Sequence, residues 1–378
     1  MVLVYLSVFL FIAYSLLIVY YWLSWRSIPE FMRSSEKTRT KFSVVIPARN
    51  EEANIIACLE SVCKQDYPAE LLQIIAVDDC STDKTWEYLQ SFNRPEKETF
   101  AVRLTQSEDD EFFAHKKRAL QTGIAMAHNE CIVTTDADCD HLTTWLKTID
   151  SFWQERRPAF IAAPVMLEND SSLVQIFQAL DFLVLQGITG ASVHKKIHAM
   201  CNGANLAYEK EAFEKVKGFD GIDNIASGDD MLLMHKIWKE FPGKVHYLKS
   251  KEAIVATLPM KTWKEFFNQR IRWASKARFY SDPKILLILL LVYLFNLSFL
   301  ILLVTGFWRH VLWSYTIALL IAKTIVEFPF VYSIAAFFNK RSLLKYFFFF
   351  QPLHIVYTVI AGWLGQLGRY EWKDRRVK

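Results

Sequence analysis

SVVIPARNEE, residues 43–52, is the stretch that decides the fold, because a β-branched run ends there in a polar turn and apolar residues spaced near 3.6 follow it to residue 64. The same strand-then-helix pattern recurs along the chain. Further β-branched runs lie at 74–77, 131–135 and 160–163, and further helical segments at 83–92 and 116–128. This alternation predicts an α/β fold with a mostly parallel sheet and helices on both faces. Ligands of such sheets collect at the carboxyl ends of the strands.

The composition indicates a membrane protein. The chain has 378 residues, of which 52% are hydrophobic and 22% charged, more apolar than is usual for a soluble domain. Residues 1–25, 285–308 and 346–368 carry no Asp, Glu, Lys or Arg, and each run could cross about 30 Å of hydrocarbon as a helix. A wholly soluble, secreted or disordered protein is excluded. The net charge of +4 is too small to suggest a nucleic acid polymer as partner.

We expect five consecutive parts. They are an N-terminal transmembrane helix (1–25), a basic connector (26–41), an α/β domain ending in interfacial helices (42–280), a C-terminal membrane region of two or three helices (281–368) and a basic tail (369–378). The basic residues after residue 25 place the middle domain in the cytoplasm by the positive-inside rule. The basic tail prefers the same side, which conflicts with simple alternation. The number of crossings therefore stays open at three or four, and Pro352 makes 346–368 a candidate re-entrant segment.

A further hydrophobic segment, 311–338, contains two ionisable residues. Lys323 and Glu327 are four residues apart and therefore share one helix face. Charged groups at that depth are usually paired or turned toward a polar interior. Two interpretations stay open: the pair locks helices together, or it stands beside a substrate path.

Polar clusters follow the predicted strands. They lie at 47–52, 78–79, 136–138 and 228–230. Taken singly, each has an ordinary explanation, because Asn50 or Asp230 could cap the helix that follows it. Two carboxylates separated by one residue, as at 136–138, can instead share a divalent cation. Asp140 and His141 would add possible ligands, but we expect them to begin the next helix.

The order of these clusters, with Gln269-Arg270-Ile271-Arg272-Trp273 just before the membrane region, resembles the membrane-anchored family-2 glycosyltransferases. That group includes cellulose, chitin and hyaluronan synthases, poly-N-acetylglucosamine synthases and ceramide glucosyltransferase. The resemblance spans about residues 41–280. Its motifs also include Lys116 ahead of Ala119-Leu120 and Asn202-Gly203-Ala204-Asn205.

The resemblance implies the GT-A fold and an inverting, metal-dependent transfer. A sugar would pass from a nucleotide diphosphate sugar, with a UDP-sugar as the expected donor, to a membrane-associated acceptor, either a growing polysaccharide or a lipid. The catalytic domain would face the cytosol, at the plasma membrane or a bacterial inner membrane. By position, the resemblance assigns the catalytic base to Asp230, the ligand of Mg²⁺ or Mn²⁺ to Asp138, and substrate binding to Pro47, Arg49, Glu51, Asp79, Lys116, Asp136, Asp229, Gln269, Arg270, Arg272 and Trp273.

These roles are chemically coherent. An in-line displacement needs one general base for the acceptor hydroxyl. A metal and an arginine fork at Arg272 would neutralise the departing diphosphate. Trp273 could stack on a sugar or anchor the membrane interface. The alternative is a non-catalytic or transport-type protein with a sugar-nucleotide-binding domain. We expect four residues to converge on one pyrophosphate pocket: Asp79, Asp138, Asp230 and Arg272. A catalytically inactive scaffold would be expected to have lost at least one of them, and all four are present.

Overall fold

The structure, a computed structural model, describes residues 1–34, 38–105, 115–168, 172–223, 225, 228–280, 282–367, 370–372 and 375–377. Residues 35–37 of the expected basic connector, and 369, 373, 374 and 378 of the expected tail, lie outside these ranges. The chain forms two compact units: an α/β unit (Pro29–Glu168 and Ala199–Leu258) and a helical unit (Met1–Ile28, Asn169–His198 and Pro259–Lys378). Residues 169–198 and 259–280, expected from sequence within the α/β domain, thus belong to the helical unit.

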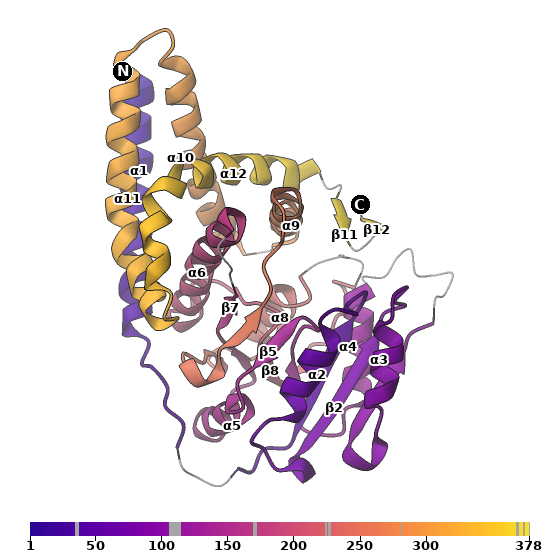
Figure 1. Ribbon diagram of the computed structural model, residues 1–378. Coiled ribbons are helices and arrows are strands. Elements are labelled where there is room, and N and C mark those ends of the chain that lie inside the picture. The colour runs from indigo at the N-terminus through magenta and orange to yellow at the C-terminus, as the bar shows by residue number, and fades with distance from the viewer. Residues whose placement is uncertain are drawn as a thin grey trace. The chain divides into compact units, whose positions relative to one another are not determined.

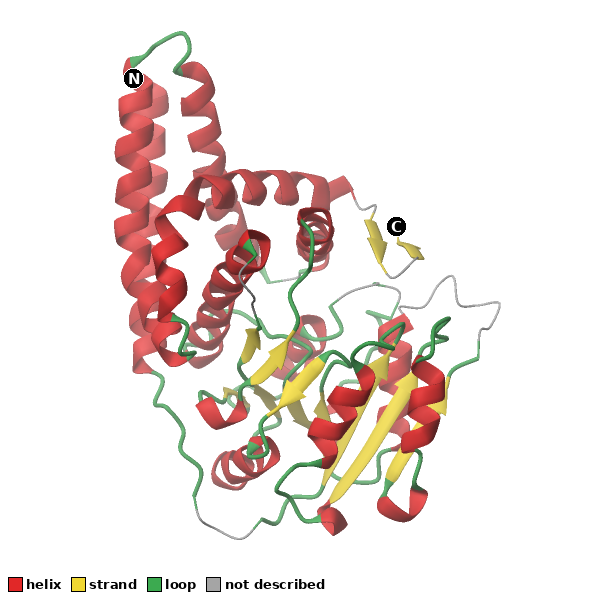
Figure 2. Cartoon of the chain, in the orientation of Figure 1, coloured by secondary structure: helices red, strands yellow, loops and turns green. Residues whose placement is uncertain are grey.

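The α/β unit contains a mixed sheet (Figures 1 and 2). Its strand order is β3-β2-β1-β4-β8-β6-β9. The strands are β1 (Phe42–Ala48), β2 (Leu72–Asp78), β3 (Thr99–Arg103), β4 (Cys131–Thr134), β6 (Phe160–Ala162), β8 (Leu206–Glu209) and β9 (Val245–Tyr247). A second sheet has the order β5-β10-β7, from β5 (Cys139–His141), β7 (Val165–Leu167) and β10 (Val255–Thr257). The helices of this unit are α2 (Ile55–Cys63), α3 (Thr85–Phe92), α4 (His115–Met126), α5 (Trp145–Arg156), α7 (Lys210–Lys215) and α8 (Met231–Glu240).

Strands β1 to β4 run parallel, and their carboxyl ends form one edge of the sheet. The central strand β1 is buried along most of its length, as expected of a parallel strand covered on both faces. Ala48 pairs with Asp78, and Asp78 with Arg103, so the polar turns after β1, β2 and β3 meet at the same level. Strand β8 is antiparallel to β4 and begins at this edge. The predicted α/β class with a parallel-rich sheet is confirmed.

One local prediction is wrong. Asp140 and His141 do not begin a helix but lie in β5, and helix α5 begins at Trp145. Strand β5 pairs with β10, opposing His141 to Val255. The two-residue period of a strand buries Cys139 and His141 and exposes Asp140.

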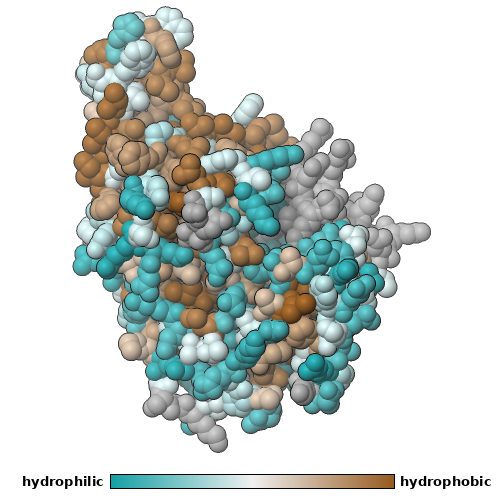
Figure 3. Space-filling model, in the orientation of Figure 1, coloured by the Kyte–Doolittle hydropathy of each residue, from teal (hydrophilic) through white to brown (hydrophobic). Residues whose placement is uncertain are grey.

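The described residues of the helical unit form six long helices. They are α1 (Val2–Ser27), α6 (Leu173–His194), α9 (Trp263–Ser275), α10 (Pro283–Thr305), α11 (Val311–Phe337) and α12 (Phe347–Leu367). A 3₁₀ segment (Arg341–Tyr346) precedes α12, and β11 (Tyr370–Trp372) pairs antiparallel with β12 (Arg375–Val377). Among the described residues, five helical segments are long and apolar enough to cross a membrane: α1, α6, α10, α11 and residues 341–367. Figure 3 shows hydrophobic side chains gathered over α1, α10 and α11.

Two of these helices differ from the sequence-based expectation. Helix α6 was not expected as a membrane segment, and 83% of its most apolar window is buried inside the protein. Helix α12 is continuous through Pro352 and not broken into a re-entrant loop. Figure 1 shows that α12 bends, as a proline inside a helix commonly causes.

Helix α4 rests directly on the sheet because residue 123 has no side chain. A Cβ at Gly123 would lie 2.4 Å from Val45 Cγ1 and 3.3 Å from Val77 Cγ2. This close approach fixes the position of the whole helix, including Lys116 in its first turn.

We predict that Gly123→Ala destabilises the protein by about 1–3 kcal/mol, as overpacking of a core does. Val45→Ala removes the clashing methyl group, so the double variant should lose less stability than the two single variants combined. The melting temperatures of the four purified proteins in detergent measure this coupling. Strictly additive losses would show that the contact does not limit the approach of α4.

Candidate active site

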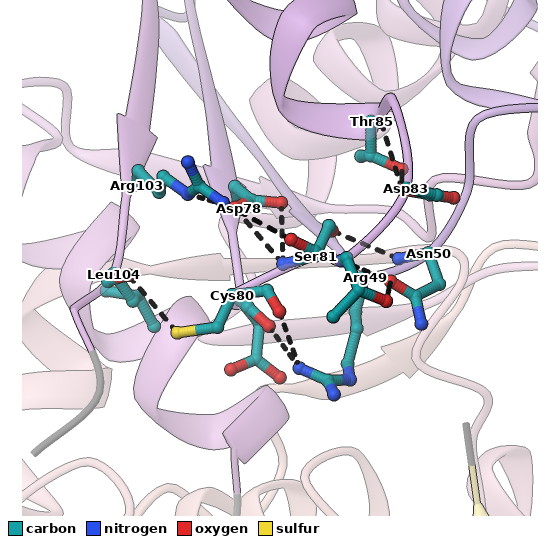
Figure 4. Close-up of polar contacts among 11 residues, drawn as sticks. Arg49, Asn50, Asp78, Cys80, Ser81, Asp83, Thr85, Arg103 and Leu104 are labelled. Carbon is teal, nitrogen blue, oxygen red and sulfur yellow. Dashed lines mark hydrogen bonds and ion pairs between the residues drawn. The ribbon is translucent and has the colours of Figure 1, made fainter. Parts of the chain in front are cut away.

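The turns after β1 and β2 are joined by hydrogen bonds (Figure 4). Arg49 is buried, and its Nη1 donates to the carbonyl oxygens of Asp79, at 2.6 Å, and Cys80, at 3.0 Å. The backbone N–H of Asn50 donates to Ser81 Oγ at 3.0 Å, and that of Glu51 donates to Thr85 Oγ1 at 2.7 Å. The two turns therefore form one rigid wall. Arg49 thus contacts the backbone of Asp79. The Glu51 carboxylate accepts a hydrogen bond from Asn54 Nδ2 at 2.8 Å.

The adjacent residues Asp78 and Asp79 have different surroundings. The Asp78 carboxylate is fully buried, accepts from the Ser81 N–H at 3.3 Å and forms an ion pair with Arg103 Nε at 3.2 Å. It closes the turn after β2. Asp79 Oδ1 lies 3.8 Å from His115 Nδ1, at the start of α4. Pro47 occupies the sheet next to Val77.

Lys116 brings together carboxylates from two distant segments. Its Nζ lies 2.6 Å from Asp136 Oδ1, just after β4, and 3.2 Å from Asp229 Oδ2, just before α8. Burial alone would lower the pKa of the Lys116 ammonium, but the negative charges of Asp136 and Asp229 outweigh it and raise the pKa above its usual value. This side chain is therefore a permanent cation at the edge of the sheet.

The Asn202 to Asn205 motif lies next to the Lys116 ammonium. A Cβ at Gly203 would lie 3.3 Å from both Lys116 Nζ and Asp229 Oδ2, so only glycine leaves this space open. Asn205 is fully buried, donates to the carbonyl oxygens of Pro164 and Ala253 at 2.8 Å, and accepts from Trp145 Nε1 at 3.0 Å. Asn205 therefore fixes the loop, while Gly203 borders the charges.

Asp230 is the N-cap residue of α8. Its Oδ1 accepts from the Met231 N–H at 2.7 Å, and the residue is 9% exposed. A helix N-terminus is a favourable position for carboxylate charge. Asp230 also adds to the negative potential at Lys116. The structure thus brings Lys116, Asp136, Asp229 and Asp230 into one cluster.

Sequence reasoning missed Lys117. This buried side chain donates through Nζ to the carbonyl oxygens of Ile222, at 2.5 Å, and Ile225, at 2.6 Å. It ties α4 to the segment that leads to Gly228. Its only signal in the sequence is its place beside Lys116.

The surroundings of Asp138 contain ionisable groups that are held neutral. Burial, with the Asp138 carboxylate, raises the pKa of the Cys139 thiol. Burial lowers the pKa of His141 to about 3. Both ring nitrogens of His141 are hydrogen-bonded at 2.8 Å, to Ser61 Oγ and Thr135 Oγ1. His141 is therefore a packing residue and not an additional metal ligand. In the described parts of the chain, no group of three His, Cys, Asp or Glu side chains is placed to hold a metal ion.

The Gln269 to Trp273 motif belongs to the helical unit, on α9. Arg270 is 4% exposed, and its Nε and Nη2 lie 2.9 and 2.7 Å from Asp181 Oδ2 on α6. Arg272 and Trp273 are partly exposed on the same helix. The Arg270 guanidinium therefore forms a buried ion pair within the protein.

Comparisons with known proteins agree with this fold. Residues 43–217 match Glycosyl transferase family 2, and residues 131–365 match Glycosyl transferase family group 2. The second match covers most of the chain. The protein therefore belongs to the family 2 glycosyltransferases.

Its relatives include the probable glycosyltransferase YdaM of Bacillus subtilis, 27% identical over 66% of this chain and 58% of YdaM. An N-acetylglucosaminyltransferase of Rhizobium meliloti is 22% identical over 62% of this chain and 55% of the relative. The chain thus spans little more than half the length of these relatives. The mannosyltransferase PcManGT from Pyrobaculum calidifontis, solved with GDP-Man and Mn²⁺, has the same fold, with a TM-score of 0.60, 19% identity and coverage of 97% of this chain and 99% of that one.

We predict that His141 makes stability depend on pH. In the folded protein His141 takes up a proton only near pH 3, whereas an unfolded histidine does so near pH 6.5. The unfolded state therefore binds more protons below pH 6.5, and stability falls as the pH falls from there, by about 2 kcal/mol at pH 5. In His141→Gln, the difference in melting temperature between pH 7 and pH 5 should shrink. The same substitution at exposed His128 is the control, and equal pH dependence in wild type and His141→Gln would contradict the assignment.

Proposed function

We propose that this protein transfers a sugar, with inversion, from a nucleotide diphosphate sugar to a membrane-associated acceptor, in a metal-dependent reaction. A UDP-sugar is the expected donor. The observation on which the proposal rests is the cluster of Lys116 with Asp136, Asp229 and Asp230 at the carboxyl edge of the parallel strands. Ligands of α/β sheets bind at this edge. The acceptor is a growing polysaccharide or a lipid.

In this proposal Asp230 is the catalytic base. One of its oxygens accepts from the Met231 N–H, which fixes the orientation of the carboxylate. Attack by the acceptor hydroxyl requires removal of its proton, for which a carboxylate within hydrogen-bond reach suffices. Asp229 pairs with Lys116 and is a positioning group for donor binding.

We assign the binding of a divalent cation to the Asp138 carboxylate. Lys116 pairs with Asp136 Oδ1 at 2.6 Å, so Asp138 is the carboxylate of the triplet that we assign to the metal. Carboxylate oxygen is the ligand type that Mg²⁺ and Mn²⁺ prefer. A cation bound there would supply positive charge to the leaving diphosphate. Lys116 would add a second positive charge.

The remaining assignments follow from the motifs. Asp79, with Pro47, Arg49 and Glu51, would form the nucleoside-binding wall. Gln269, Arg272 and Trp273 would serve the diphosphate and acceptor, and Arg270 would position α9. Arg26 lies in the last turn of α1 and further basic residues follow it, so the α/β unit would face the cytosol.

The proposal is tested by incubating membranes that contain the protein with a panel of radiolabelled nucleotide sugars. Label in organic solvent indicates a lipid product, and label retained on a sizing column indicates a polymer. The product anomer, determined by NMR, should be opposite to that of the donor.

In the same assay we predict that Asp230→Asn lowers turnover by roughly 1,000-fold or more, because the general base is lost. Asparagine caps helices about as well as aspartate, so the fold and donor binding should persist. Asp282→Asn, at the cap of α10, is the matched control and should keep full activity. Equal loss of donor binding and turnover in Asp230→Asn would refute the base assignment.

We also predict that excess EDTA stops turnover and that added Mn²⁺ or Mg²⁺ restores it. Asp138→Asn should lower turnover by roughly 100-fold or more, since a charge-stabilising group is lost from the leaving diphosphate. Asp140→Asn changes an exposed neighbour of the same type and should have little effect. Full activity in EDTA, or equal effects of the two substitutions, would contradict the metal role of Asp138.

A further inference from the structure

The helical unit contains a buried charge pair that joins three helices. Asp181 lies in the middle of α6, a helix otherwise free of acidic and basic residues until its last turn. Its Oδ2 accepts from Arg270 on α9, and its Oδ1 accepts from the Tyr357 hydroxyl on α12. All three residues are less than 10% exposed. Both carboxylate oxygens are thus used by side chains from other helices.

The Arg270 guanidinium in turn touches two other residues of its motif. Its Nη1 donates to Gln269 Oε1 at 2.6 Å. Its Cζ lies 4.2 Å from the centre of the Trp273 ring and 4.7 Å from that of Phe266. The place of Arg270 therefore sets the side-chain positions of Gln269 and Trp273.

Helix α12 connects this pair to a second buried network. Gln351 Oε1 accepts from Lys323 at 2.5 Å, and its Nε2 donates to Glu327 Oε2 at 2.7 Å. Lys323 and Glu327 pair at 2.7 Å on α11. Gln351 and Tyr357 are six residues apart on α12, and His354 lies between them, three residues from each. His354 Nε2 lies 3.9 Å from Asp181 Oδ1.

Packing between α9 and α12 is equally close. A Cβ at Gly365 of α12 would lie 2.7 Å from Ala274 Cβ and 3.0 Å from the Ser275 nitrogen, just beyond the motif. Any rotation of α9 would therefore break the Asp181–Arg270 pair or collide with α12. A buried ion pair adds little net stability, because desolvation offsets its attraction. Such a pair is better suited to fixing one geometry.

We infer that Asp181 and Tyr357 are positioning residues for sugar transfer: they hold Arg270 and thereby the Gln269, Arg272 and Trp273 side chains of α9 in their working arrangement. The inference rests on the proposed function for its kinetic consequence only. Neither residue is assigned to touch substrate.

Tyr357→Phe is the central test, because it removes one hydroxyl and leaves the ring in place. Its matched control is Tyr21→Phe, which removes a buried hydroxyl that contacts His198 at 3.1 Å elsewhere in the helical unit. Asp181→Asn and Arg270→Lys complete the set. We expect kcat to fall roughly 10- to 100-fold in Tyr357→Phe and Asp181→Asn with the donor KM unchanged, since small displacements of positioned groups cost about this much. The double variant Asp181→Asn/Tyr357→Phe should lose little more kcat than Asp181→Asn alone.

A second readout needs no activity. With 5-fluorotryptophan incorporated at position 273, the ¹⁹F resonance should shift or broaden in Tyr357→Phe and Asp181→Asn and stay unchanged in Tyr21→Phe. Unchanged spectra in both variants, or equal kinetic and spectral effects of Tyr357→Phe and Tyr21→Phe, would overturn the inference. If the wild type transfers no sugar from any donor while the ¹⁹F shifts occur as expected, the proposed function fails and the positioning of α9 stands.

Discussion

The geometry of the candidate active site in the α/β unit depends on one cation, the Lys116 ammonium. Its carboxylate partners, Asp136 and Asp229, come from the end of β4 and from the segment before α8, and Asp230 stands beside them. Carboxylates this close to one another repel, and a shared cation is what allows them to share a site. The position of Lys116 follows from that of α4, which approaches β1 closely because Gly123 has no side chain. A packing constraint on one face of the sheet thus determines the charge arrangement at its edge.

The paired acidic motifs divide their work in a consistent way. Asp78 closes a turn and pairs with Arg103, and both Asp136 and Asp229 pair with Lys116. In each motif the other member is the one to which we assign a role toward the substrate: Asp79 in nucleoside binding, Asp138 as the metal ligand and Asp230 as the catalytic base. A carboxylate bound by the protein holds its loop rigid, so its neighbour presents a fixed geometry to the substrate.

Strands β1, β2, β4 and β6, most helices and the polar clusters could be predicted from sequence because each depends on local pattern: a β-branched run, a helical period, or acids directly after a strand. Features that depend on distant partners could not. Helix α6 escaped detection because Asp181, Gln178 and Gln186 lower its apolar character, and the partner of Asp181 on α9 lies 89 residues away. For the same reason the ion pair of Arg270 with Asp181 could not be predicted, and the motif alone suggested substrate binding for Arg270. His141 was misplaced because its strand, β5, exists only through pairing with β10.

In the helical unit, too, buried charged groups are held by partners from other segments of the chain. A membrane-spanning helix depends on such partners more strongly, since hydrocarbon offers no water to satisfy a charge. Lys323 and Glu327 satisfy each other and also bind Gln351 of α12, while the Tyr14 hydroxyl of α1 donates to Glu327. Of the two interpretations of this pair, these contacts favour the lock between helices. Helix α12 binds this lock with Gln351 and the Asp181–Arg270 pair with Tyr357, so it joins α1, α11, α6 and α9. The α9 motif is therefore held by the helices that would anchor the enzyme in the bilayer, and its orientation is set by polar bonds whose loss would leave a buried charge without a partner.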